Sequence, residues 1–86
     1  MNEIRTKITR ILADKLALDE SGLHDNLKFY DDLGVDSLDF CEAIVDVEKA
    51  FNIGIPDDDA ERLKTIGALV AYVEKNANHR NLLQVA

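Results

Sequence analysis

Residues 32–39 read Asp-Leu-Gly-Val-Asp-Ser-Leu-Asp, where an acidic loop ends and the longest apolar helix pattern of the chain begins. Asp36 is placed to cap that helix, and Asp39 completes a pattern that resembles the reciprocal capping box. Ser37 then becomes the first helical residue, with its hydroxyl free in solvent. A phosphate is favoured at such a position, because backbone N–H groups and the helix dipole attract an anion. The competing interpretation makes Ser37 itself the cap, which is the commoner role of a serine before a helix.

The spacing of apolar residues predicts an all-α protein, a small four-helix bundle. Three longer helices and one short helix are expected, at residues 3–17, 37–51, 57–63 (the short one) and 66–77. Thr65 is the expected N-cap of the last helix. A long loop, residues 18–36, joins the first two helices and leaves room for one short helical turn.

The predicted second helix is apolar over more than one face. One stripe fits the core and consists of Phe40, Ala43, Ile44, Val47 and Phe51. A second stripe lies beside it and consists of Leu38, Cys41 and Val45. We expect Leu38 to meet a partner, while partner contact and core contact both stay open for Val45. Cys41 is interpreted as a small hydrophobic residue, the usual role of a lone cysteine, rather than a reactive thiol.

A chain of 86 residues is long enough for one small domain, which we place at residues 1–78. Residues 79–86 are treated as a C-terminal tail, for which disorder and continuation of the last helix both stay open. No run of apolar residues is long enough to cross a membrane, and the N-terminal residues lack an apolar signal segment. With a single cysteine, no internal disulfide can form, so a reducing, cytoplasmic location is expected.

Charge is distributed unevenly along the chain. Residues 31–61 carry eleven acidic side chains and a single basic one, Lys49, whereas residues 1–30 are balanced and residues 62–86 have a net charge of +3. The middle third therefore predicts a strongly negative surface, which makes nucleic acid an unsuitable partner. Proteins with basic patches are the favoured partners, with fast, salt-sensitive association.

Catalytic and metal sites find little support in the sequence. Only two histidines, His24 and His79, could serve Ser37 as a base, and both stand in polar contexts typical of solvated side chains. A twelve-residue calcium loop starting at residue 31 fails, because apolar residues occupy ligand positions and Asp36 stands where glycine is required. Weak binding of a divalent ion by Asp31, Asp36 and Asp39 stays open.

Taken together, the stretch at residues 32–39, Glu42, Phe51 and the Ile-x-Ile-Pro-Asp pattern at residues 53–57 resemble the acyl carrier protein family. The resemblance covers about residues 3–77. It implies a four-helix carrier bundle in which Ser37 bears a covalent 4′-phosphopantetheine arm, installed from coenzyme A by a phosphopantetheinyl transferase. The thiol of the arm would carry acyl groups as thioesters between enzymes of fatty acid biosynthesis, and the apolar helix interior would take up the acyl chain.

The resemblance also implies which residues meet the partner enzymes. Leu38, Glu42 and Glu48 match the recognition helix of the family, and Asp36 and Asp39 flank the modified serine. The implied partners are the transferase, enzymes of fatty acid synthesis and acyltransferases with basic docking patches, and the carrier itself is expected to be a monomer. Phe40, Cys41 and Lys49 depart from the usual pattern of the family, so a specialised carrier for polyketide or other acyl transfer is an alternative. An alternative from another class is an unmodified acidic interaction module.

Overall fold

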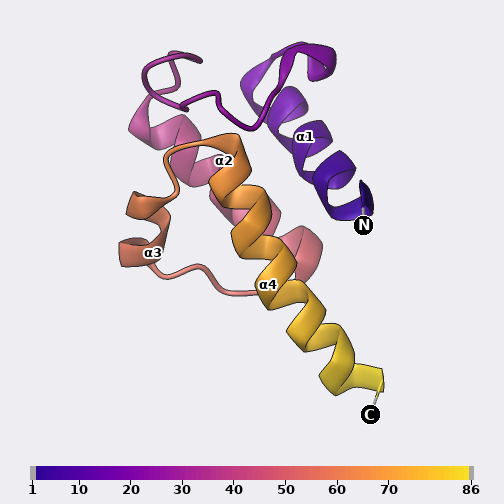
Figure 1. The fold of residues 1–86 in the computed structure, drawn as a ribbon. Helices are drawn as coiled ribbons and strands as arrows, with labels where there is room; N and C mark the ends of the chain where they lie inside the picture. Colours follow the sequence, from indigo (N-terminus) through magenta and orange to yellow (C-terminus); the bar gives the residue numbers. More distant parts are fainter. Residues whose placement is uncertain (1, 86) are drawn as a thin grey trace.

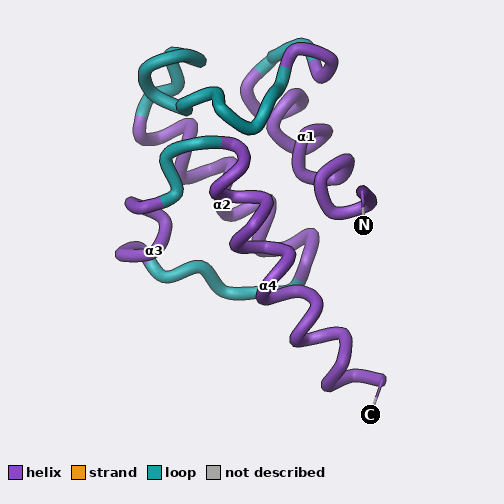
Figure 2. Tube along the Cα trace, in the orientation of Figure 1, coloured by secondary structure: helices purple, strands orange, loops and turns teal. Residues whose placement is uncertain are grey.

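The computed structural model describes the backbone of residues 2–85 and the side-chain surroundings of residues 3–77. In the part of the chain so described, four α-helices and one 3₁₀ turn follow one another without any extended strand (Figures 1 and 2): α1 (Asn2–Leu16), η1 (Glu20–Gly22), α2 (Ser37–Phe51), α3 (Asp57–Arg62) and α4 (Ile66–Val85). The prediction of an all-α bundle with three longer helices, one short helix and a long first loop is confirmed.

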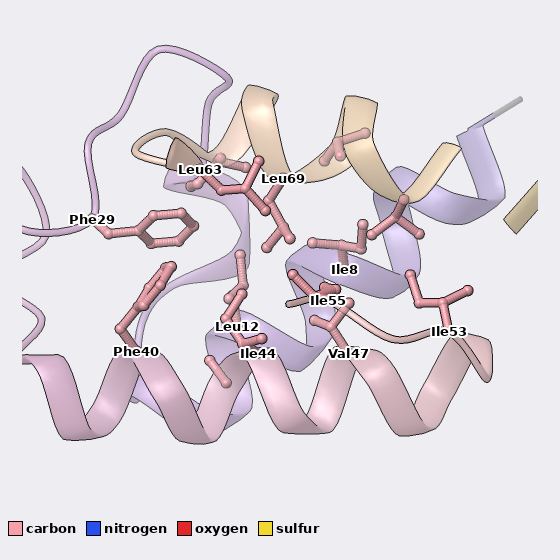
Figure 3. Close-up of a cluster of buried hydrophobic side chains, with 14 of the residues drawn as sticks. Ile8, Leu12, Phe29, Phe40, Ile44, Val47, Ile53, Ile55, Leu63 and Leu69 are labelled. Atoms are coloured by element: carbon pink, nitrogen blue, oxygen red, sulfur yellow. The ribbon is translucent and has the colours of Figure 1, made fainter. Parts of the chain in front are cut away.

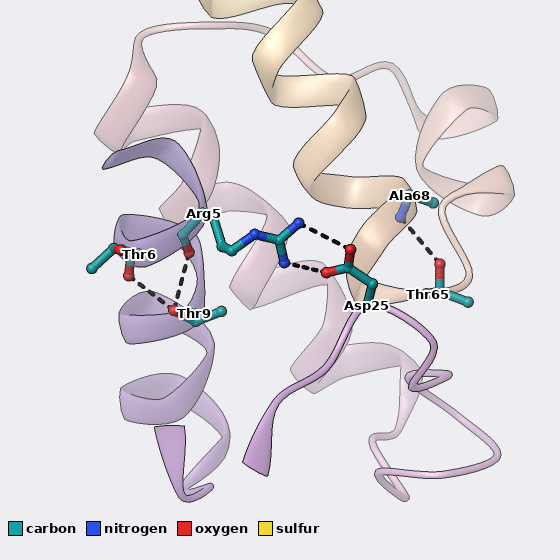
Figure 4. Close-up of polar contacts among 6 residues, drawn as sticks. All are labelled: Arg5, Thr6, Thr9, Asp25, Thr65 and Ala68. Atoms are coloured by element: carbon teal, nitrogen blue, oxygen red, sulfur yellow. Dashed lines mark hydrogen bonds and ion pairs between the residues drawn. The ribbon is translucent and has the colours of Figure 1, made fainter. Parts of the chain in front are cut away.

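Local signals set the ends of the helices where the sequence predicts them. The backbone N–H of Ala68 donates to Thr65 Oγ1 at 3.1 Å, so Thr65 caps α4 as expected (Figure 4). At the other end of α2, Asn52 adopts a left-handed conformation with φ of 55° and donates its N–H to the carbonyl of Glu48. Asparagine tolerates this conformation better than most residues do, which allows the helix to stop there.

The last helix differs in length from the predicted one. α4 begins at Ile66 as expected but continues to Val85, so that its C-terminal part extends beyond the rest of the bundle in Figure 1. The backbone of residues 79–85 is thus drawn as a continuation of α4, and disorder of this tail stays an untested alternative. The side chains of this segment lie outside the described residues, and the domain boundary at residue 78 stays a prediction.

A single hydrophobic core lies where the inner faces of the helices meet (Figure 3). Its fully buried large side chains are Ile8, Leu12, Phe29, Val47, Ile66, Leu69, Val70 and Val73. Of the core stripe predicted for α2, only Phe51 is half-buried rather than buried, because it lies at the last turn of the helix. Ile53 and Ile55 are buried after α2 and close the core from that side.

The long loop is held to the start of α4 by backbone pairing. Phe29 donates its N–H to the carbonyl of Lys64 at 3.0 Å, and Ile66 donates its N–H to the carbonyl of Leu27 at 3.1 Å. The side chain of Phe29 is 1% exposed, so the loop contributes one of the best-buried rings of the core. A segment that must pack along the bundle and reach α4 needs this length, which explains why the connection is long.

A second attachment of the loop involves α1 and Gly67. The carbonyl of Asp25 accepts the N–H of Gly67 at 2.9 Å, while the carboxylate of Asp25 accepts two hydrogen bonds from the guanidinium of Arg5 (Figure 4). A Cβ at position 67 would lie 2.9 Å from Asp25 Cβ, so only glycine permits this close approach.

Candidate functional site at the start of helix α2

The first turn of α2 is capped as the sequence predicts. Asp36 has an extended conformation, and its Oδ1 accepts the backbone N–H of Asp39 at 2.8 Å. Ser37 is therefore the first helical residue and not the cap. Only this half of the capping box forms: no bond between the Asp39 carboxylate and the N–H of Asp36 is found among the described residues, because aspartate is one methylene shorter than the usual glutamate.

The hydroxyl of Ser37 is exposed and takes part in no hydrogen bond with another described residue. The second serine of the chain, Ser21, provides a contrast, because its hydroxyl donates to Asp19 Oδ1 at 2.9 Å. Ser37 Oγ is thus available for a covalent bond to an external group, at the end of a helix where backbone N–H groups favour an anion.

Two residues of the preceding loop fix the approach to Ser37. Gly34 has φ of +65°, a left-handed conformation in which a side chain is strained. Val35 is 7% exposed and donates its N–H to the carbonyl of Phe29 at 3.0 Å. The turn at Gly34 and the anchor at Val35 together direct the chain into α2 with Asp36 and Ser37 outside the core.

A groove of about 680 Å³ lies beside Ser37. It runs between the start of α2, the loop around Tyr30 and the short α3, with Ser37, Phe40 and Cys41 on the α2 side and Ala60 and Leu63 at α3 and its end. Its volume falls within the range of small-molecule sites. The groove therefore offers space for a group attached to Ser37.

Three groove residues from other segments were not singled out by the sequence. Lys28, Lys64 and Tyr30 line it together with Ser37. Lys28 and Lys64 line the same groove because the backbone of Phe29 pairs with that of Lys64, a long-range contact that no local pattern indicates. Phe29 and Tyr30 lie in a turn that buries Phe29 and leaves Tyr30 half-exposed, and no local pattern indicates this either.

The side chain of Tyr30 is partly buried, and about half of the residue's surface is exposed. Burial is the main cause that raises the pKa of its hydroxyl above the ordinary value, and negative charge at Cys41, Asp36 and Glu61 acts in the same direction. The raised pKa extends to higher pH the range over which the phenol stays neutral.

The residues expected to meet partners fall into two groups. Leu38 is 66% exposed, and Asp36, Asp39 and Glu42 are exposed on the first turns of α2 around Ser37. Glu48 lies three turns further on, half-buried, and its Oε2 accepts the N–H of Ile55 at 2.7 Å. This bond gives Glu48 a structural role, because it holds the chain that leads from α2 to α3.

The outer stripe of α2 is exposed as well. Val45 is 43% exposed and Cys41 is exposed, so neither is covered by the core. Core contact, one of the two alternatives for Val45, is thereby not what the structure shows. The reason is geometric: the core wraps around one face of α2 only, and Phe40, Ala43, Ile44 and Val47 occupy that face. Cys41 is a free cysteine on the surface, and its interpretation as a small hydrophobic residue rather than a reactive thiol stays a prediction.

The structure gives no support to the weak divalent-ion site predicted at Asp31, Asp36 and Asp39. Within the described part of the chain, no three carboxylate, histidine or cysteine side chains are gathered closely enough to hold a metal ion. One carboxylate oxygen of Asp36 is already engaged, because it caps α2. His24 forms no hydrogen bond with Ser37, and the side chain of His79 lies outside the described residues.

None of the helices described in this structure is long and apolar enough to span a lipid bilayer.

Comparison with known proteins identifies the family. A family model described as phosphopantetheine attachment site matches residues 6–73. Two relatives named acyl carrier protein are 42% identical over 76 residues (Porphyromonas gingivalis; 88% of this chain and 97% of the relative) and 41% identical over 73 residues (Thermotoga maritima; 85% and 90%). The solved structure of an acyl carrier protein from Enterococcus faecalis superimposes with a TM-score of 0.76 at 32% identity, covering 87% of this chain and 95% of that one.

The family model and both relatives span the first turn of α2, the groove and the core, so the chain belongs to the acyl carrier protein family, whose members are carriers rather than catalysts and bear a covalent 4′-phosphopantetheine arm.

Proposed function

We propose that Ser37 Oγ is the attachment point of the 4′-phosphopantetheine arm. The observation that carries this proposal is an exposed hydroxyl without a hydrogen-bond partner among the described residues, on the first turn of a helix that Asp36 already caps. The residues present fit the group, because Ser37 would hold the phosphodiester where backbone N–H groups favour an anion, and the adjacent groove has room for the rest of the arm. When bound, the arm supplies a thiol that holds acyl groups as thioesters.

The exposed residues around Ser37 would direct the carrier to its partners. Family membership implies exchange with a transferase and with enzymes of synthesis. We assign recognition of basic docking patches to Asp36, Leu38, Asp39 and Glu42, with Leu38 as an apolar contact among the acids, and we keep Glu48 as a more distant contributor. Such small charged interfaces associate fast and dissociate readily, as a shuttle requires.

Fatty acid biosynthesis in the cytoplasm, by a monomeric carrier, is the setting we propose. The typical role of acyl carrier proteins and the single, unpaired Cys41 on the surface both support it. A specialised carrier for polyketide or other acyl transfer is the alternative, and the acyl group found on protein from its native source distinguishes the two.

The attachment site is tested by intact mass after incubation with a phosphopantetheinyl transferase and coenzyme A. The expected result is the gain of one phosphopantetheine, which fragmentation places on Ser37. Ser37→Ala abolishes the gain while helical circular dichroism is retained. The matched control is Ser21→Ala, which removes the other serine and leaves the gain intact. An unchanged mass, under conditions that modify a known carrier, contradicts the proposal and favours an unmodified acidic interaction module.

A further inference from the structure

Two lysines line the groove beside Ser37. Lys28 comes from the long loop and Lys64 from the segment between α3 and α4. The loop folds back at Lys28: the N–H groups of Asp32 and Leu33 donate to its carbonyl at 3.0 and 3.1 Å, and the carboxylate of Asp32 accepts its N–H at 2.8 Å. These bonds hold the backbone of Lys28 beside the segment that leads into α2.

Backbone pairing brings the second lysine to the same place. The N–H of Phe29 donates to the carbonyl of Lys64 at 3.0 Å, and the carbonyl of Phe29 accepts the N–H of Val35 at 3.0 Å. Val35 precedes Ser37 by two positions. Phe29 therefore joins the backbone of Lys64 to the chain just before the helix start. Both lysines thus belong to segments that are tied to the entry of α2, although neither is a sequence neighbour of Ser37.

Neither lysine has an acidic partner in the described part of the chain. Both are exposed, and neither takes part in any of the ion pairs found among residues 3–77. Three acids line the same groove without pairing with them, namely Asp31, Asp57 and Glu61. The ammonium groups of Lys28 and Lys64 are therefore available to an anion that the fold itself does not supply.

The phosphodiester of the arm is such an anion. On Ser37 Oγ it would stand on a turn of α2 that also carries the exposed carboxylates of Asp36 and Asp39. Negative groups so close together repel one another, and the repulsion raises the free energy of the loaded protein unless cations lie near. Lysine suits this task, because its ammonium is a compact point charge on a flexible stem that can reach a phosphate from a neighbouring segment.

We propose that Lys28 and Lys64 form a phosphate-binding pair, which holds the phosphodiester beside Ser37 and offsets its repulsion by Asp36 and Asp39. The proposal rests on attachment of the arm at Ser37, and it concerns the phosphate rather than the acyl group. Carboxylates of a docking enzyme are the competing partners of the two lysines. The phosphate is favoured over them because it is tethered, so its local concentration does not depend on an encounter.

The first test compares the acetylation rate of each lysine in the apo and the loaded protein. Acetic anhydride reacts with the neutral amine, so an ion pair that favours the ammonium form slows the reaction. Peptide mass spectrometry gives the rate for each lysine separately. After loading, the rates at Lys28 and Lys64 should fall by about twofold to fivefold, the range that exposed ion pairs provide. Lys49 and Lys75 are the controls, because both are exposed and neither lines the groove, and their rates should not change.

Salt distinguishes an ion pair from simple cover by the rest of the arm. At about 1 M NaCl the Debye length is about 3 Å, so protection that depends on charge should be largely lost. Protection that persists at this salt concentration would be due to cover by the pantetheine chain, and it would overturn the proposal. Equal rates in the apo and loaded protein, or a lower rate at only one of the two lysines, would also overturn it.

A second measurement follows the phosphate itself. The ³¹P resonance of the loaded native protein should shift between low salt and about 1 M NaCl, because salt releases the phosphate from the lysines. In the double variant of Lys28→Gln with Lys64→Gln, this salt-dependent shift should be lost. Lys49→Gln removes the same charge at the other end of α2 and should keep the native shift. A double variant that keeps the native shift would contradict the pair.

The variants and the loading reaction are controlled independently of these readouts. All three substituted lysines are exposed, so the variants should fold as the native protein does, which circular dichroism checks. Intact mass is measured before either experiment. An unchanged mass refutes attachment at Ser37 and with it the pair, whereas loaded protein with unprotected lysines refutes the pair alone.

Discussion

Because the side chain of Asp36 caps α2, the hydroxyl of Ser37 is left without a capping role. Its carboxylate satisfies the N–H of Asp39, so the serine hydroxyl is not needed as a cap. Asp36 caps the helix and Ser37 offers an exposed hydroxyl, so the start of α2 serves both as a helix end and as a candidate site.

Removal of the cap should weaken the fold by a measurable amount. Asp36→Ala should lower the free energy of unfolding by about 1 kcal/mol in urea denaturation, because the N–H of Asp39 loses its partner. Asp36→Asn should restore most of the loss, since asparagine caps as well as aspartate. Asp31→Ala, an exposed acid of the same loop, is the control and should change stability by less than about 0.5 kcal/mol. An equal effect of the alanine and asparagine variants would contradict a capping role.

Gly34 should be sensitive to substitution for a backbone reason alone. A Cβ at position 34 meets no atom within 4 Å, yet φ is +65°. Gly34→Ala should therefore cost about 1 kcal/mol in the same denaturation measurement, the usual penalty of a left-handed conformation. Gly54→Ala is the matched control, because that site is equally open and its φ is not positive, and it should be neutral or slightly stabilising.

Among the helices, α3 has the fewest stabilising features within its own residues. It has six residues, no side-chain cap and no buried residue. It is held from outside by Tyr72 of α4, whose hydroxyl donates to Asp59 Oδ2 at 2.8 Å, and by its flanking buried residues Ile55 and Leu63. Because α3 borders the groove, this bond also helps to define the site.

Loss of the Tyr72 hydroxyl should loosen α3 selectively. Tyr72→Phe should lower the free energy of unfolding by about 1 kcal/mol and speed amide hydrogen exchange in α3 more than in α2. Tyr30→Phe removes a hydroxyl that bonds to no other described residue, and it should leave exchange in α3 unchanged. Equal exchange rates of α3 in the two variants would show that the bond does not hold this helix.

The hydrogen bond between Tyr72 and Asp59 predicts that stability changes at alkaline pH. Burial, and then the hydrogen bond to Asp59, raises the pKa of Tyr72 above its ordinary value. A group whose pKa is raised on folding contributes stability below its unfolded pKa, and that contribution is lost as pH rises through the folded pKa. The difference in free energy of unfolding between the native protein and Tyr72→Phe, measured by urea denaturation, should therefore decrease above about pH 10.

Across the bundle as a whole, the contact of Arg5 with Asp25 joins three parts of the chain. It connects α1 to the long loop (Figure 4). Asp25 in turn connects the loop to α4, because its carbonyl accepts the N–H of Gly67. The hydrogen bonds from Arg5 are the main cause that holds the pKa of Asp25 below its ordinary value, with charge attraction in support.

Protonation of Asp25 at low pH should weaken its contact with Arg5. A carboxyl whose pKa is lowered on folding contributes stability above its unfolded pKa, near 3.9 for aspartate, and the contribution is lost as pH falls through the lower folded value. Arg5→Gln should therefore be less stable than the native protein at neutral pH, and the difference should shrink below about pH 4. In Arg10→Gln, which removes a longer, exposed ion pair with Glu20, little change is expected at any pH. A difference for Arg5→Gln that does not depend on pH would contradict the assignment.

Local patterns in the chain were sufficient to predict the helices and the position of the serine, because helix periodicity and caps depend on residues three or four positions apart. α2 lies at the predicted residues, Asp36 and Thr65 cap as expected, and the outward stripe from Leu38 to Val45 is exposed. The length of α4 was left open, since the residues after Asn78 have no clear apolar period to decide it.

The surroundings of Ser37, by contrast, depend on contacts between distant segments. The groove arises because the backbone of Phe29 pairs with that of Lys64, thirty-five residues further along the chain, and so brings Tyr30 and Lys28 to α3. The bond from Ile55 to Glu48, the exposure of Cys41 and the separation of the three aspartates likewise depend on how the elements pack. Such contacts result from the burial of a shared core over long distances in sequence, and no pattern of neighbouring residues encodes them.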